Sequence, residues 1–112
     1  MKVLLLEDNC LLREAMVWTL EWNGNEVVSF ARGDEALAYL ETHTVGLIVM
    51  DWNMPVMSGA EFLGRARSRF LPLFTPQVVV VSGDVLAGVE AQRLGADRFL
   101  AKPMPPERLL AV

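Results

Sequence analysis

Short apolar runs alternate with longer amphipathic stretches along the 112 residues of the chain. Apolar runs of about four to eight residues between turn residues are typical of buried strands. Such runs lie at 3–6, 27–30, 45–50, 78–81 and 98–101. Apolar positions that recur every three or four residues indicate helices. They lie at about 10–23, 34–42, 59–69 and 86–94, with a final segment from about 106. This alternation predicts one α/β domain over 1–112, a doubly wound, five-stranded parallel sheet with helices on both faces.

Turn and cap residues support these boundaries. Ser58 and Glu61 form the Ser-x-x-Glu pattern of a capping box at the start of the third helix. Gly24 follows the first helix, where a left-handed C-terminal cap favours glycine. Asp34 is the predicted N-cap of the second helix. Pro72 and Pro76 interrupt the chain before the fourth strand and predict a loop there.

Two of the predicted helices are weak. Gly88 lies inside the fourth helix and lowers its helix propensity, so we expect that helix to be short or irregular. The final segment has fewer than two turns between Pro106 and Val112, so we expect a truncated last helix. Either the chain stops early, or a longer protein continues beyond Val112.

The composition narrows the class of protein. A net charge of −4 argues against nucleic-acid binding by this domain, which requires clustered Lys and Arg. The single cysteine, Cys10, cannot form an internal disulfide and fits a reducing compartment. No stretch approaches the ~20 apolar residues of a membrane span. We therefore expect a cytoplasmic protein that contacts neither membrane nor nucleic acid through this domain.

Polar residues follow four of the five predicted strands. They are Glu7 and Asp8, then Asp51, then Ser82, then Lys102. Because ligands of open parallel sheets bind beyond the carboxyl ends of the strands, we expect these side chains to share one site. Carboxylate oxygens are the ligands that a hard divalent cation such as Mg²⁺ prefers. The sequence therefore predicts a cation site at this edge of the sheet.

The same set of residue types suits phosphoryl transfer, which needs positioned positive charge more than covalent chemistry. Asp51 could attack phosphorus and form an aspartyl phosphate. Lys102 could supply a point charge, and Ser82 could donate a hydrogen bond to a phosphoryl oxygen. A Mg²⁺ ion held by Asp8 and Asp51 would supply further positive charge.

The segments that carry these residues resemble the receiver domains of response regulators in two-component signalling. They are Leu6-Glu7-Asp8-Asn9, Met50 to Gly59, Val81-Ser82-Gly83 and Ala101-Lys102-Pro103. The resemblance covers essentially the whole chain and keeps the family's order of acid pair, phosphoacceptor strand, hydroxyl strand and Lys-Pro. It implies a flavodoxin-like sheet with the strand order 2-1-3-4-5.

The resemblance also implies a role for each site residue. Asp51 would be the phosphoacceptor, and Asp8 and Asp51 would bind Mg²⁺ or Mn²⁺ directly. Asn53 would offer the metal its backbone carbonyl, and Glu7 would hold the metal through water.

Four further roles follow from the resemblance. Ser82 would be the switch hydroxyl and Lys102 the partner of the phosphoryl group. Phe99 would be an aromatic switch, although an aromatic residue in a last strand is more often part of the core. Pro103 would follow a cis peptide bond, which is common only before proline.

The implied function is a signalling switch that a histidine kinase or a histidine phosphotransfer protein phosphorylates. Such a domain is not an enzyme for an external substrate, because it catalyses only its own phosphorylation and dephosphorylation. A small aspartyl-phosphate phosphatase would usually carry a second aspartate as general acid two residues after the nucleophile, where this chain has Asn53. A module that works without phosphorylation would not need Asp51, Ser82 and Lys102 together. The cognate kinase, an output domain beyond Val112 and a homodimer all stay open.

The first helix carries two apolar stripes. We expect the stripe that faces the sheet to contain Leu12, Met16 and Leu20. The neighbouring stripe contains Leu11, Ala15, Trp18 and Trp22. The two tryptophans either pack on a fifth helix or form an exposed aromatic patch for a partner, and the sequence does not separate these alternatives.

Overall fold

The structure of the chain is a computed structural model that describes residues 1–70 and 76–111. Its centre is a parallel five-stranded sheet with the order β2-β1-β3-β4-β5, which confirms the predicted order. The strands are β1 (Lys2–Leu6), β2 (Glu26–Phe30), β3 (Leu47–Asp51), β4 (Gln77–Ser82) and β5 (Arg98–Ala101). Each strand lies within two residues of its predicted position, because short apolar runs between turn residues mark buried strands.

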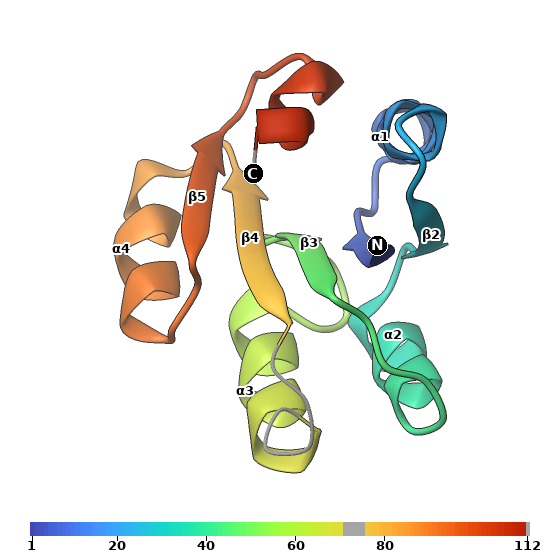
Figure 1. The fold of residues 1–112 in the computed structure, drawn as a ribbon. Helices are drawn as coiled ribbons and strands as arrows, with labels where there is room; N and C mark the ends of the chain where they lie inside the picture. The colour runs from blue at the N-terminus through green and yellow to red at the C-terminus, as the bar shows by residue number, and fades with distance from the viewer. Residues whose placement is uncertain (71–75, 112) are drawn as a thin grey trace.

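Helices cover both faces of the sheet, as predicted (Figure 1). They are α1 (Cys10–Trp22), α2 (Gly33–Leu40), α3 (Gly59–Arg69), α4 (Val85–Arg93) and the 3-10 helix η1 (Pro106–Ala111). Buried residues of α2, α3 and α4 form one apolar cluster with the sheet, and α1 and η1 form a second cluster on the opposite face. The sheet, whose carboxyl edge carries the predicted site residues, therefore has an apolar core on each face.

Alternation along β1 explains why the strands read as continuous apolar runs. Leu4 and Leu6 belong to the cluster under α2, α3 and α4, whereas Val3 and Leu5 belong to the cluster under α1. Successive side chains of a strand point to opposite faces, and here both faces are covered. A strand of this kind therefore has no solvent-facing position to mark with a polar residue.

Two of the predicted caps are confirmed. The Ser58 hydroxyl accepts a hydrogen bond from the Glu61 N–H at 3.2 Å, so Ser58 is the N-cap of α3. Gly24 has φ +88° and donates its N–H to the Glu21 carbonyl at 3.0 Å after the end of α1. A positive φ is unfavourable for other residues, which explains why glycine occupies this position.

The prediction that Asp34 caps α2 is wrong. Arg32 occupies the N-cap and makes no capping bond through its side chain, and the helix begins at Gly33. The Asp34 carboxylate lies in the first turn, where it accepts the Glu35 N–H and two hydrogen bonds from the Arg32 guanidinium. The Arg32 bonds hold the pKa of Asp34 below its usual value. An acid in the first turn also interacts favourably with the helix dipole. Because aspartate is favourable both at the N-cap and in the first turn, the residue type alone did not distinguish these two positions.

The two weak helices differ in outcome. The helix α4 is short, as expected, but Gly88 does not interrupt it. The final segment forms the 3-10 helix η1, and its Leu109 is buried in the cluster under α1.

Pro76, one of the two prolines of the predicted loop, is buried immediately before β4, whereas Pro72 and Val112 lie outside the described residues. None of the described helices has the length and hydropathy that a membrane span requires.

Candidate functional site

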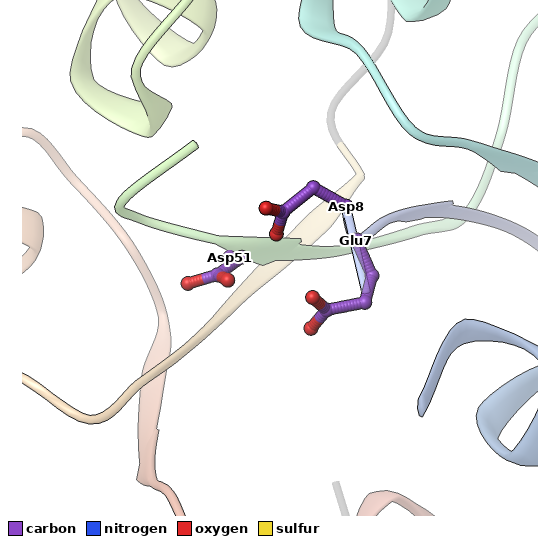
Figure 2. Close-up of side chains that lie close together, drawn as sticks. All are labelled: Glu7, Asp8 and Asp51. Carbon is purple, nitrogen blue, oxygen red and sulfur yellow. The ribbon is translucent and has the colours of Figure 1, made fainter. Parts of the chain in front are cut away.

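The three predicted carboxylates meet at the carboxyl edge of the sheet. The strands β1 and β3 are neighbours, and Leu6 pairs with Met50, so the residues that follow them lie side by side. One carboxylate oxygen each from Glu7, Asp8 and Asp51 lies within 4.8 Å of the others (Figure 2). Glu7 and Asp51 are 1% and 8% exposed, whereas Asp8 is open to solvent. Buried acids packed this closely repel one another unless positive charge lies near them.

Lys102 supplies that positive charge. It follows β5, and its Nζ donates hydrogen bonds to Glu7 Oε1 at 2.8 Å and to Asp51 Oδ2 at 3.1 Å. Its backbone N–H also bonds to the Ser82 carbonyl at 2.9 Å, which anchors the residue to β4. The sequence placed Lys102 and Asp51 in one site, but it did not reveal the ion pair with Glu7. These two residues are 95 positions apart, and no local pattern links them.

The pKa shifts of this ion pair show how the charges balance. Burial raises the pKa of the Glu7 carboxyl, and the hydrogen bonds from Lys102 and from the Asn9 N–H only partly oppose it. Burial lowers the pKa of the Lys102 ammonium, but its hydrogen bonds to Glu7 and Asp51 outweigh this effect and raise the pKa overall. Lys102 therefore stays protonated, and its single ammonium group faces a cluster of three carboxyl groups.

Ser82 lies at the end of β4, beside the acidic cluster. Its buried hydroxyl oxygen accepts a hydrogen bond from the Asp84 N–H at 3.1 Å and faces Asn53 Nδ2 at 3.5 Å. The resemblance to receiver domains assigned a role to the backbone carbonyl of Asn53, but the contact of the Asn53 side chain with Ser82 was not predicted. The end of β4 and the loop that follows Asp51 are thus in contact.

Close packing shapes the loop between β3 and α3. Gly59 donates its N–H to the Trp52 carbonyl at 2.7 Å, and a Cβ at this position would lie 2.7 Å from Trp52 Cα. Only glycine allows this approach. Val56, at the exposed tip of the loop, has φ 72°, a conformation that is strained for a β-branched residue. This loop follows Asp51 directly and carries Asn53, so its shape influences where the oxygens of both residues lie.

A second contact of this loop was also missed. The indole Nε1 of Trp52 donates a hydrogen bond to Glu90 Oε1 on α4 at 2.8 Å. Trp52 is buried, and a buried indole N–H usually has an acceptor. This general rule indicates that a partner exists, but it does not identify Glu90.

Phe99 and Pro103 complete the predicted set. Phe99 is half-buried on β5 and packs against the cluster under α2, α3 and α4, with its ring close to Gly88. The Lys102–Pro103 peptide bond is cis. The predicted site as a whole brings an acidic cluster, an ammonium and a hydroxyl to the carboxyl edge of the sheet, a set that suits a cation and a phosphoryl group.

The stripes of α1 lie on different sides of the helix. Met16 and Leu20 are buried against the sheet and Leu12 packs partly against them, as predicted. Trp18 and Trp22 are 66% and 77% exposed, and their rings stack with centroids 5.4 Å apart. Of the two alternatives for the tryptophans, the described residues therefore agree with an exposed aromatic patch.

Comparison with known proteins identifies the family. The family model described as response regulator receiver domain matches residues 3–112. The response regulator protein FleR of Pseudomonas aeruginosa is 39% identical over 109 residues, which cover 97% of this chain and 23% of FleR. The phosphate regulon transcriptional regulatory protein PhoB of Escherichia coli is 30% identical, over 98% of this chain and 48% of PhoB. The chain thus spans only a quarter to a half of the length of these relatives.

The fold comparison agrees. The chemotaxis response regulator CheY4 of Vibrio cholerae superposes with a TM-score of 0.89 at 33% identity, over 98% of this chain and 92% of CheY4. Receiver domains act as phosphorylation-based switches in two-component systems, and they bind Mg²⁺ through acidic residues. A match over nearly the whole chain, in both sequence and fold, shows that this protein belongs to the response regulator receiver domain family.

Proposed function

We propose that this domain accepts a phosphoryl group on Asp51 from a histidine kinase or a histidine phosphotransfer protein. One observation carries the proposal: Asp51 lies at the end of a buried strand, within 3.1 Å of the Lys102 ammonium and beside two further acids. A buried carboxylate in this setting can act as a nucleophile while a neighbouring cation neutralises the charge of the incoming group.

The acidic cluster fits a Mg²⁺ or Mn²⁺ ion. Asp8, Asp51 and the backbone carbonyl of Asn53 would hold it directly, and Glu7 would hold it through water. The hydrogen bonds of Glu7 support this division, because Oε1 accepts from Lys102 and Oε2 accepts from the Asn9 N–H at 3.1 Å. When bound, the cation would offset the negative charge of the phosphoryl oxygens.

The chemical step needs few residues. An Asp51 carboxylate oxygen attacks phosphorus and forms a new O–P bond. The P–N bond of the phosphohistidine donor breaks, and its electron pair returns to the imidazole nitrogen. Lys102 Nζ, which now donates to Asp51, is close enough to donate to a phosphoryl oxygen instead. The domain catalyses only its own phosphorylation and dephosphorylation.

The signal would pass through Ser82 and Phe99. The Ser82 hydroxyl accepts its present hydrogen bonds and keeps its own O–H to donate to a phosphoryl oxygen. Movement of Ser82 toward that oxygen would open space into which the half-buried Phe99 ring can turn. The surface around α4 and β5 would then differ between the two states and would control an output domain beyond Val112, a homodimer or another protein. We place this switching in the cytoplasm and assign no nucleic-acid contact to the domain itself.

Incubation with acetyl phosphate and Mg²⁺, followed by intact-protein mass spectrometry, tests the proposal. We expect the wild-type domain to gain one phosphoryl group, and removal of Mg²⁺ with a chelator to prevent the gain. Asp51→Asn should gain none, whereas Asp34→Asn, which removes an exposed acid from α2, should behave as wild type. Equal labelling of Asp51→Asn would contradict the assignment, and rapid hydrolysis of acetyl phosphate without a labelled protein would favour a phosphatase.

A further inference from the structure

Trp52 is held at two points that belong to different elements. Its carbonyl accepts the N–H of Gly59 at the start of α3, at 2.7 Å. Its indole N–H donates to the carboxylate of Glu90 on α4, at 2.8 Å. Glu90 is 38 positions away in the chain, and its side chain is the polar partner that reaches the indole from α4.

Residue 52 lies between the two residues whose oxygens matter most for the proposed chemistry. Asp51 precedes it and carries the nucleophile, and Asn53 follows it and offers a backbone carbonyl. Because peptide groups are rigid planes, a rotation about the backbone bonds of residue 52 must displace the peptide groups on both sides of it. The bond from Gly59 restrains the peptide group that joins Trp52 to Asn53, and the bond to Glu90 fixes the side chain of the same residue.

Open space remains around the Glu90 side chain. A cavity of about 150 Å³ lies on one side of Glu90, with Trp52, Asn53 and Asp84 among its lining residues. A second hollow of about 400 Å³ lies between Ala60 and α4, and Glu90 lines this one as well. The open space lies around the Glu90 carboxylate, whereas the Trp52 ring is buried, with 4% exposure. The charge-assisted hydrogen bond therefore selects one position of the Glu90 side chain and joins α4 to the residue between Asp51 and Asn53.

We propose that Glu90 is a positioning residue for phosphorylation. Its carboxylate holds the Trp52 indole, and through it the spacing between the Asp51 carboxylate and the Asn53 carbonyl. The inference rests on the proposed function, in which both of these groups meet the cation. Glu90 lies on α4, outside the acidic cluster. Its loss weakens cation binding and slows phosphorylation, although the acids stay in place.

The test uses Trp52 as its own reporter. Trp18→Phe and Trp22→Phe leave Trp52 as the single tryptophan of the three in the chain. In this background, Glu90→Leu removes the acceptor and Glu90→Gln keeps an oxygen that can still accept. Glu35→Leu is the control, because it removes the same charge from α2.

We expect Glu90→Leu to shift the indole N–H resonance of the metal-free protein upfield. Mg²⁺ affinity, measured by Trp52 fluorescence, and the rate of phosphorylation by acetyl phosphate should each fall by about threefold to tenfold, which is within the net range of a typical hydrogen bond. Glu90→Gln should recover most of both losses, and Glu35→Leu should leave all three readings at their original values.

Two results would overturn the inference. An unmoved indole resonance in Glu90→Leu would mean that the hydrogen bond is absent in solution. A shifted resonance with unchanged Mg²⁺ affinity and phosphorylation rate would mean that Glu90 only stabilises the fold. Failure of the unsubstituted domain to take up phosphate would instead count against the proposed function, and the resonance and the Mg²⁺ titration would still decide the role of Glu90.

Discussion

Glu7 differs from the other acids of the cluster because both of its oxygens already accept hydrogen bonds. Its ion pair with Lys102 brings positive charge close to Asp51, and its burial is tolerated because the ammonium lies within 2.8 Å. Removing one partner of a buried pair leaves the other charge uncompensated, which is usually more destabilising than losing both. Glu7 and Lys102 therefore act together, although they lie at opposite ends of the chain.

Phe99 offers a test of the switch at the scale of one residue. If phosphorylation draws Ser82 toward the phosphoryl oxygens, the ring should leave its present place beside Gly88 and occupy a second rotamer. Such a population shift requires only a few kcal/mol of differential interaction between the two states. Crystal structures of the free and beryllofluoride-bound domain provide the measurement. An unmoved Ser82 loop with one Phe99 rotamer in both structures would remove Phe99 from the mechanism.

Among the elements, α3 and α4 each contain one glycine in the helix interior, but the surroundings of these two glycines differ. A Cβ at Gly64 on α3 would meet nothing within 4 Å, whereas a Cβ at Gly88 on α4 would lie 3.1 Å from the Phe99 ring. Helix propensity alone favours alanine at both positions by about 1 kcal/mol. The structure therefore separates a glycine that is merely permitted from one that makes room for an aromatic ring.

A pair of substitutions checks this difference. Gly64→Ala should raise the free energy of unfolding by about 0.5–1 kcal/mol, because it gains helix propensity without a new contact. Gly88→Ala should gain less or be destabilising, because the Phe99 ring must move by a few tenths of an ångström. Denaturant melts of both variants provide the comparison. Equal stabilisation by the two alanines would show that the Phe99 ring does not constrain α4.

At the scale of the whole molecule, two features of the surface stand out. The acidic cluster concentrates negative charge at one edge of the sheet. On α1, the exposed Trp18 and Trp22 form an aromatic patch together with Leu11, which is 75% exposed. The patch lies on the helix that covers the face opposite to α4, so it is separate from the surface around Phe99.

Metal binding should stabilise the entire domain. A ligand that binds only the folded state raises the free energy of unfolding by mass action, by about 2.7 kcal/mol at a concentration of a hundred times Kd. For a domain of this size, that gain corresponds to a rise in the melting temperature of roughly 10 °C or more. A thermal melt with increasing MgCl₂ is the measurement, with NaCl of equal ionic strength as the control. A melting temperature that responds equally to both salts would mean that the acidic cluster holds no cation.

The sequence by itself determined the class of fold and the members of the site. Strand and helix positions follow from local periodicity, because each pattern reflects which side of its own element faces the core. The acids, Ser82 and Lys102 could be placed in one site because the carboxyl ends of parallel strands share an edge. The resemblance to a family then supplied the strand order, which no local pattern contains.

Only the tertiary structure decided which side chains touch. The ion pair of Glu7 with Lys102 and the hydrogen bond of Trp52 with Glu90 join residues 95 and 38 positions apart. The exposure of Trp18 and Trp22 depended on what packs beside α1, and the N-cap of α2 depended on where the chain leaves β2. Periodicity describes how a segment meets the core as a whole. A contact between two side chains depends on how two separate elements are placed, and that placement is a property of the folded chain.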